Sequence, residues 1–181
     1  MPSAWVQAYL GHAEPGKTRL ALDVACGSGR HTRLALTRGY HVTAVDRDVE
    51  AVRVFGALPE VQSIAADLED GSPWPLRGRV FDAVIVTNYL HRPLMHDIVG
   101  SVAPDGILIY ETFAIGQERF GKPSNPDYLL RPGELIQAVR DKLIPFAYEQ
   151  VMLDGPRIVQ RIAAVGPGHP WLKAPPAKGD A

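Results

Sequence analysis

The stretch "LDVACGSGRHT", residues 22–32, decides the fold because it joins a buried strand to a helix through two closely spaced glycines. Apolar residues fill most of 20–25, which predicts a buried strand, and 30–38 predicts a helix. Gly27 and Gly29 allow the backbone to approach a ligand without interference from a Cβ atom. The first amides of the helix that follows favour an anion. The stretch therefore predicts a cofactor-binding loop in an α/β protein.

Strands and helices alternate along the rest of the chain, which is typical of a doubly wound α/β sheet. Two apolar runs around the turn "DGPR" predict a C-terminal hairpin and hence one antiparallel strand. We therefore expect a Rossmann-like sheet of seven strands, mostly parallel. The expected strands are 20–25, 41–45, 61–66, 80–88, 106–113, 146–153 and 158–165, and the expected helices are 3–12, 30–38, 49–58, 92–102 and 131–143.

Length and composition indicate one globular domain. The chain has 181 residues, of which 46% are hydrophobic and 22% charged, so it suits a single core. We expect the domain to span 1–166 and the Pro-, Gly- and Ala-rich residues 167–181 to be disordered. The net charge of −1, without any run of lysines or arginines, does not favour a nucleic-acid partner.

Other classes of site lack support in the sequence. A single cysteine, Cys26, permits no intramolecular disulfide, and the six histidines form no i, i+4 pair, so no metal site is expected. The N-terminus shows no basic region followed by an apolar core, and no apolar run approaches the ~20 residues that span a bilayer. We therefore expect a cytoplasmic protein without a membrane segment.

Acidic residues near the strand ends separate two kinds of cofactor. Asp46 follows the second strand, where a carboxylate binds the hydroxyl groups of a ribose. This position fits dinucleotides and S-adenosylmethionine equally. The third glycine of a dinucleotide loop, however, is replaced by Thr32, and Asp23 precedes the loop by four residues. A carboxylate there repels a pyrophosphate and attracts an ammonium or sulfonium group, directly or through water.

These motifs together resemble a known family. "LDVACGSG", the Asp46 that ends "HVTAVD", Ala66-Asp67-Leu68 and "FDAVIVTNYLH" resemble class I S-adenosylmethionine-dependent methyltransferases over about residues 18–165. The small bacterial methyltransferases of the tellurite-resistance type are the most similar. The resemblance implies a seven-stranded sheet with an antiparallel hairpin strand, S-adenosylmethionine as cofactor and S-adenosylhomocysteine as product.

The same resemblance implies a role for each matching residue. Ala25, Gly27 and Gly29 are expected at the methionine part, Asp46 at the ribose, Asp67 and the Leu68 amide at the adenine, and Asn88 and Tyr89 near the departing methyl group. The complete set of expected cofactor-binding residues is Asp23, Ala25, Gly27, Ser28, Gly29, His31, Asp46, Arg47, Asp67, Leu68, Asn88 and Tyr89.

Structural alternatives remain open for several of these residues. Asp46 is equally suited to cap a helix, and "DLEDG" around Asp67 is also typical of an acidic surface turn. His31 is expected either at the cofactor carboxylate or in solvent, and Cys26 is expected to be a packing residue. Asn88-Tyr89 lacks the two prolines of the amino-group methyltransferase signature N-P-P-Y, which argues against an adenine, cytosine or glutamine acceptor.

The cofactor brings its own leaving group, so alignment and exclusion of water carry most of the catalysis. A base is needed only for a protonated nucleophile, and the candidates are His91, Tyr89 and Glu111, with a plain helix-start role as the alternative for His91.

The long segment 114–130 is expected to cover the substrate, or else to be an ordered surface loop. Its candidate wall residues are Glu111, Phe113, Phe120, Asn125 and Tyr128.

The sequence thus predicts a methyltransferase that acts on a small molecule. A protein or RNA acceptor and a non-catalytic S-adenosylmethionine-binding module are the alternatives. The acceptor, the methylated atom and the oligomeric state do not follow from the sequence.

Overall fold

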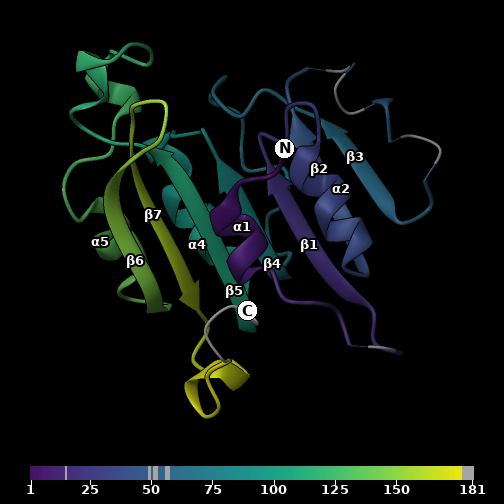
Figure 1. Cartoon of the computed structure of the whole chain (residues 1–181). Helices are drawn as coiled ribbons and strands as arrows, with labels where there is room; N and C mark the ends of the chain where they lie inside the picture. The colour runs from purple at the N-terminus through teal and green to yellow at the C-terminus, as the bar shows by residue number, and fades with distance from the viewer. Residues whose placement is uncertain (15, 49, 51–52, 56–57, 177–181) are drawn as a thin grey trace.

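A seven-stranded sheet runs through the protein, with helices on both of its faces (Figure 1). The structure is a computed structural model that describes residues 1–14, 16–48, 50, 53–55 and 58–176. The strand order is β3-β2-β1-β4-β5-β7-β6, and only β7 runs against its neighbours, so the expected α/β architecture is confirmed. The strands are β1 (Arg19–Val24), β2 (Tyr40–Asp46), β3 (Val61–Ala65), β4 (Phe81–Thr87), β5 (Val102–Phe113), β6 (Ile144–Leu153) and β7 (Arg157–Val165), and the α-helices are α1 (Ala4–Tyr9), α2 (Arg30–Thr37), α4 (Met95–Gly100) and α5 (Glu134–Val139).

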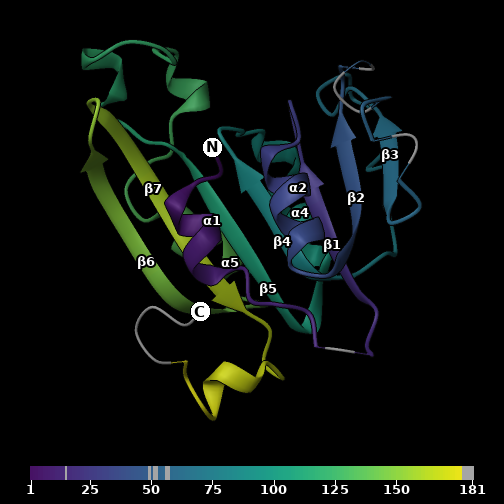
Figure 2. The same cartoon turned by 45° about the vertical axis from the view of Figure 1, so that its right-hand side comes forward.

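The order of the strands creates a switch point in the middle of the sheet. β1 pairs in parallel with β2 on one side and with β4 on the other. The chain therefore leaves β1 towards β2 and β3, and later returns on the opposite side through β4 and β5. Figure 2 shows these strands pointing towards the same end of the molecule, above which the segment after β5 lies. Ligands of open α/β sheets bind at such a switch point, outside the carboxyl ends of the strands.

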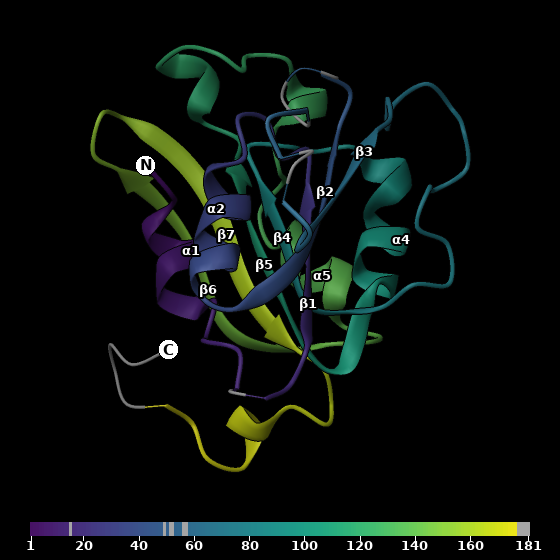
Figure 3. The same cartoon turned by 90° about the vertical axis from the view of Figure 1, so that its right-hand side faces the viewer.

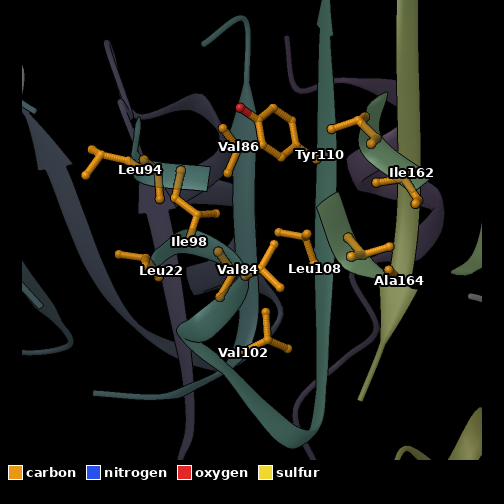
Figure 4. Packing of buried hydrophobic residues seen from close by; sticks show 14 of the residues in the cluster. Leu22, Val84, Val86, Leu94, Ile98, Val102, Leu108, Tyr110, Ile162 and Ala164 are labelled. Carbon is orange, nitrogen blue, oxygen red and sulfur yellow. The ribbon is translucent and has the colours of Figure 1, made fainter. Parts of the chain in front are cut away.

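Helices cover both faces of the sheet (Figure 3), and an apolar cluster lies on each face. On one face Trp5, Val6 and Leu10 from and just after α1 are buried against the sheet. On the other face α4 and α5 cover a larger cluster, part of which appears in Figure 4. β4 lies between both layers, which explains its continuous run of β-branched residues. Each fully buried aliphatic side chain contributes about 1.5–3 kcal/mol to stability.

Several predicted boundaries are wrong by a few residues. Residues 92–102, expected as one helix, form a 3-10 turn at Arg92–Leu94 and the helix α4, which ends at Gly100. Val102 instead pairs with Phe81, so β5 begins four residues before its predicted start. α1 and α5 are also shorter than expected, and α5 begins only after Gly133, whose φ of 73° is not helical. The predicted helix 49–58 lies largely outside the described residues.

The described part of the C-terminal segment packs against the sheet. Pro170–Leu172 form a 3-10 turn, and the Trp171 ring lies 5.2 Å from the ring of Phe146. The Gly168 amide donates to the carbonyl of Pro104. Residues 167–176 thus contact the domain at these points, and 177–181 lie outside the described residues, so the disorder expected for 167–181 stays a prediction. None of the described helices combines the length and apolar character that a membrane crossing requires.

The loop between β1 and α2 depends on its two glycines. Gly27 has a φ of 51° and Gly29 a φ of 71°, a left-handed conformation that side chains disfavour. The surroundings of the two differ. A Cβ atom on Gly29 would lie 2.0 Å from Cζ of Phe55, whereas a Cβ atom on Gly27 would meet nothing within 4 Å. Phe55 therefore fills the space that a side chain at Gly29 would need.

This difference predicts unequal effects of two matched substitutions. Gly27→Ala is expected to lower the free energy of unfolding by about 1–2 kcal/mol, the cost of a left-handed alanine. Gly29→Ala is expected to cost about 1–3 kcal/mol more, because Phe55 must move. Urea denaturation followed by circular dichroism measures both. Equal losses for the two variants would contradict the packing of Phe55 on the loop.

Candidate functional site

A cavity of about 400 Å³ lies at the carboxyl ends of the parallel strands. It spans the switch point between β1 and β4, the expected place for a ligand in this architecture. Its residues come from the ends of five strands and from the segment that follows β5. They are Ala25, Asp46, Arg47, Ala66, Asp67, Leu68, Glu69, Asn88, Tyr89, Leu90, Thr112, Phe113, Pro123 and Tyr128.

The cavity collects part of the predicted cofactor-binding set. The residues that line it are Ala25, Asp46, Arg47, Asp67, Leu68, Asn88 and Tyr89. The structure places Asp23, Gly27, Ser28, Gly29 and His31 outside this lining. The glycine loop is nevertheless adjacent, since the Gly27 amide donates to the carboxylate of Asp46. The individual roles of all these residues towards a cofactor stay predictions.

Asp46 is held in place by backbone amides. Its Oδ2 accepts from the Gly27 amide at 2.7 Å and its Oδ1 from the Asp48 amide at 2.9 Å. The side chain is half-buried and lines the cavity. Each carboxylate oxygen has a second lone pair, so these bonds leave capacity for hydroxyl groups of a ligand. The carboxylate is thus oriented before any ligand arrives.

Asp67 lies in an acidic turn and also lines the cavity. Its Oδ1 accepts from the Glu69 amide at 2.9 Å, as in an acidic surface turn. Because Asp67 also lines the cavity, its position agrees with either expected role, the surface turn or the contact with adenine. Glu69 is a wall residue that the sequence analysis missed, although its place two positions after Asp67 was a usable signal. Burial, with Glu69 and Asp67 nearby, raises the pKa of Tyr89. Tyr89 is therefore protonated at neutral pH.

The backbone is left-handed at both strand ends that flank the switch point. Ala25, after β1, has a φ of 51°, and Asn88, after β4, has a φ of 54°. Both residues line the cavity. Asparagine tolerates this conformation, whereas for alanine it costs about 1–2 kcal/mol. Strained residues of this kind cluster at functional sites, which agrees with a ligand site here.

Asp23 lies behind the glycine loop and not in the cavity. It is fully buried, and its Oδ2 accepts from the hydroxyl of Thr32 at 2.7 Å. Thr32, which replaces the third glycine of a dinucleotide loop, thus supplies the hydrogen bond that ties α2 to β1. Burial raises the pKa of Asp23 to about 6, and the hydrogen bonds from Thr32 oppose this rise. A direct contact between Asp23 and a bound cation is not supported by this geometry.

His31 and Glu111 belong to a buried network under the N-terminus. Nε2 of His31 accepts from the Ser3 amide at 3.0 Å, and Nδ1 lies 3.2 Å from the Thr87 hydroxyl. The Ser3 hydroxyl donates to Glu111 at 2.9 Å, and Arg161 donates to the other carboxylate oxygen at 3.3 Å. Burial lowers the pKa of His31 to about 4, so the ring is neutral. The solvent-facing alternative for His31 is therefore excluded.

His91 and Cys26 take structural positions. His91 precedes the 3-10 turn Arg92–Leu94, in agreement with the helix-start alternative, and it lies outside the lining of the cavity. Burial raises the pKa of the Cys26 thiol to about 12, which fits a packing residue. The role of His91, Tyr89 or Glu111 as a base stays a prediction. Within the described ranges, no three His, Cys, Asp or Glu side chains are grouped to hold a metal ion.

The segment 114–130 is anchored beside the cavity. It contains the 3-10 turns Gln117–Arg119 and Pro126–Tyr128. Arg92 donates to the carbonyl of Asp127 at 2.6 Å and to that of Leu129 at 2.9 Å, which fixes the backbone on both sides of Tyr128. Of the expected wall residues, Phe113 and Tyr128 line the cavity, whereas Glu111, Phe120 and Asn125 do not. The analysis missed Pro123, which does.

Comparison with known protein families finds a match within the chain. Residues 21–106 match the family described as a methyltransferase domain. This part of the chain, just under half of its length, is thus similar to a methyltransferase domain. The match begins in β1, covers the glycine loop and Asp46, and continues through β4 into β5. The match agrees with the predicted class of enzyme, a methyltransferase. No curated protein sequence matches the chain significantly.

Solved structures share the fold of this chain. TehB from Haemophilus influenzae aligns with a TM-score of 0.65 at 16% identity, over 83% of this chain and 58% of that protein. A TehB-like SAM-dependent methyltransferase from Corynebacterium glutamicum aligns with a TM-score of 0.59 at 16% identity, over 83% and 81%. The cyclase SpnF aligns with a TM-score of 0.64 at 15% identity, over 90% and 78%.

These likenesses confirm the predicted fold and the predicted resemblance to TehB-type methyltransferases. Among the structures that share the fold, several are described as S-adenosylmethionine-dependent methyltransferases, which supports the predicted cofactor. The chain spans 58% of the length of the Haemophilus protein. The presence of a cyclase shows that the fold by itself does not determine the reaction.

The buried position of Asp23 predicts a pH dependence of stability. The pKa of Asp23 is about 6 in the folded protein against 3.8 as its ordinary value, so the folded state binds the proton more tightly. The contribution of this bound proton to stability is complete below pH 3.8, the ordinary pKa, and is lost as the pH rises through 6. Between these limits the wild type is expected to lose about 3 kcal/mol relative to Asp23→Asn.

Chemical denaturation of both proteins at pH values from 4 to 8 measures this difference. Other titrating groups, including His31, contribute equally to the two proteins and cancel. A stability difference that stays constant across this range would contradict the burial of an ionisable Asp23.

Proposed function

We propose that the protein transfers a methyl group from S-adenosylmethionine to a small-molecule acceptor. The observation that carries this proposal is the cavity itself, which combines carboxylates from the ends of β2 and β3 with aromatic walls from β5 and the segment after it. Its volume of about 400 Å³ falls within the range of small-molecule sites, roughly 300–1,000 Å³. The methyltransferase family match supplies the class of reaction.

The two ends of the cavity suit the two reactants. In the proposal, Asp46 accepts the ribose hydroxyls, and Asp67 and the Leu68 amide meet the adenine. The carboxylates at this end also favour a cationic sulfonium cofactor. Phe113, Pro123 and Tyr128 lie at the other end and provide an apolar surface for the acceptor.

In the proposed reaction, a lone pair of the acceptor attacks the methyl carbon in line with the carbon–sulfur bond. That bond breaks, its electrons stay on sulfur, and S-adenosylhomocysteine leaves. The protein contributes alignment and exclusion of water. A proton on the acceptor passes to solvent or to a base. Because Glu111 is already bonded to Ser3 and Arg161, His91 is the first base to test.

A small acceptor is favoured over a protein or RNA by the shape of the site. Pro123 and Tyr128 of the segment 114–130 form one wall of the cavity, and Arg92 fixes the backbone around Tyr128. A macromolecular acceptor would have to enter between this segment and the strand ends. The expected cytoplasmic location belongs to the same proposal.

Isothermal titration calorimetry tests the cofactor assignment. We expect S-adenosylhomocysteine to bind and NAD to give no heat of binding. Asp46→Ala is expected to weaken the binding of S-adenosylhomocysteine by about 1–3 kcal/mol, because charge-assisted hydrogen bonds are lost. Asp154→Ala, which removes the same charge from the exposed turn between β6 and β7, is expected to leave the affinity unchanged.

Binding of NAD without binding of S-adenosylhomocysteine would contradict the proposal. Transfer of labelled methyl from S-adenosylmethionine to total protein or RNA, but to no component of a metabolite extract, would contradict the small-molecule acceptor. Tight S-adenosylhomocysteine binding without any methylated product from these sources would instead favour the non-catalytic module.

A further inference from the structure

The acceptor end of the cavity continues into a second hollow. This hollow has a volume of about 430 Å³ and is lined by Lys122, Pro123, Ser124, Asn125 and Tyr128. Pro123 and Tyr128 also line the main cavity, so the two spaces are adjacent at these residues. A ligand of sufficient length can therefore lie in both. We call the second space the Lys122 groove.

The Lys122 groove presents hydrogen-bond donors. The Asn125 side-chain oxygen is used inside the protein, where it accepts from the Asp127 amide at 3.0 Å, and this leaves the Asn125 NH₂ group for a ligand. Ser124 adds a hydroxyl, and Lys122 adds an ammonium group. In the described part of the chain, Lys122 makes no ion pair. Three donors in one groove, one of them charged, fit a carboxylate.

Charge is distributed unequally along the combined space. Asp46, Asp67 and Glu69 lie in the main cavity at the ends of β2 and β3. Lys122 lies in the groove beyond Tyr128. The segment itself carries two carboxylates: Glu118 accepts from the Gly116 amide, and Asp127 acts with Glu134 to raise the pKa of Arg92. An anionic acceptor is thus repelled from the cofactor end and attracted to the groove, which orients it.

The junction of the two spaces is apolar and aromatic. Phe113 and Pro123 line the main cavity, and the Tyr128 ring, 46% exposed, lies where cavity and groove meet. Arg92 holds the backbone on both sides of Tyr128, so the position of this ring is fixed by the fold. Flat rings pack well against such surfaces, and stacking adds to the gain from burial.

We propose that the acceptor is a small aromatic carboxylic acid that binds with its ring between Phe113, Pro123 and Tyr128 and its carboxylate on Lys122, Ser124 and Asn125. This inference rests on the proposed methyl transfer and names the substrate class of the same site. The nucleophilic atom is on the ring side away from the carboxylate, facing the methyl group. Its lone pair forms the new bond, the sulfur keeps the electrons of the broken bond, and any proton on the nucleophile leaves to solvent.

The single cation of the groove argues for a carboxylate over a nucleic-acid backbone. A polyphosphate chain is bound by several positive side chains along its path. Lys122 is the only positively charged residue in the lining of the groove. The lining of the main cavity contains Arg47, together with the three carboxylates of Asp46, Asp67 and Glu69. One charge and two neutral donors match one carboxylate group.

Binding of matched pairs of probes tests the inference. The protein saturated with S-adenosylhomocysteine is titrated with para-hydroxybenzoate, para-aminobenzoate and para-mercaptobenzoate, and with the carboxamide of each. We expect each acid to bind about tenfold or more tightly than its amide, since the acid gains a charge-assisted contact. Lys122→Met is expected to abolish this preference for the acids. The matched control is Arg131→Met, which removes an exposed positive charge that lies nearby in sequence but outside the groove, and this variant is expected to keep the preference.

Equal affinity for acids and amides, or a preference that survives Lys122→Met, would overturn the inference. So would the absence of binding by every probe. Unchanged affinity of Lys122→Met for S-adenosylhomocysteine shows that the variant is folded. If S-adenosylhomocysteine does not bind at all, the proposed function fails. The same comparison of acids and amides on the free protein then still shows whether the Lys122 groove binds a carboxylate.

Discussion

The end of β2 at Asp46 joins three strands of the sheet and defines the site. Its carboxylate accepts from the Gly27 amide in the loop after β1, and its carbonyl accepts from the Ala66 amide after β3. The neighbouring carbonyl of Val45 accepts from the Cys26 amide. Without these bonds the glycine loop has no fixed position relative to β2 and β3, because its left-handed glycines restrict it little. The floor of the cavity therefore depends on the end of β2, through one carboxylate and two backbone carbonyls.

Two further sets of hydrogen bonds position the rest of the site. Behind the loop, Asp23 and Thr32 connect β1 to α2 by a buried hydrogen bond. On the opposite side, Arg92 binds Glu134 through two bonds and also holds the carbonyls of Asp127 and Leu129. Arg92 follows β4 closely, so the strand that forms one side of the switch point also positions the wall of the cavity. Cofactor and acceptor ends are thus built on the same rigid strands.

Sequence patterns predicted the sheet well because most strands are local apolar runs, several of which are followed by a glycine or an acid. The patterns failed where distant contacts decide. β5 starts early because Val102 pairs with Phe81, which belongs to another strand. The burial of His31 depends on Ser3, which is 28 positions away in sequence. No local pattern records such a contact.

The same reasoning applies to the candidate site. The acids and the polar residues at strand ends were predictable, since the carboxyl ends of parallel strands meet at one edge. Pro123 and the Lys122 groove were not, because the path of the segment 114–130 is set by Arg92, which lies far from it in sequence. Glu111 was a reasonable choice of base from its place on β5, but Ser3 and Arg161 occupy its carboxylate. Here too the deciding partners are remote.

The assignment of Asp46 to a ribose is tested most directly by a double-mutant cycle. Wild type and Asp46→Ala are each titrated with S-adenosylhomocysteine and with an analogue that lacks the ribose hydroxyls. We expect a coupling free energy of about 1–3 kcal/mol, because the variant no longer distinguishes the two ligands. If both proteins bind the analogue more weakly than S-adenosylhomocysteine by the same factor, the coupling free energy is zero within error. That result would contradict the assignment of Asp46 to the ribose.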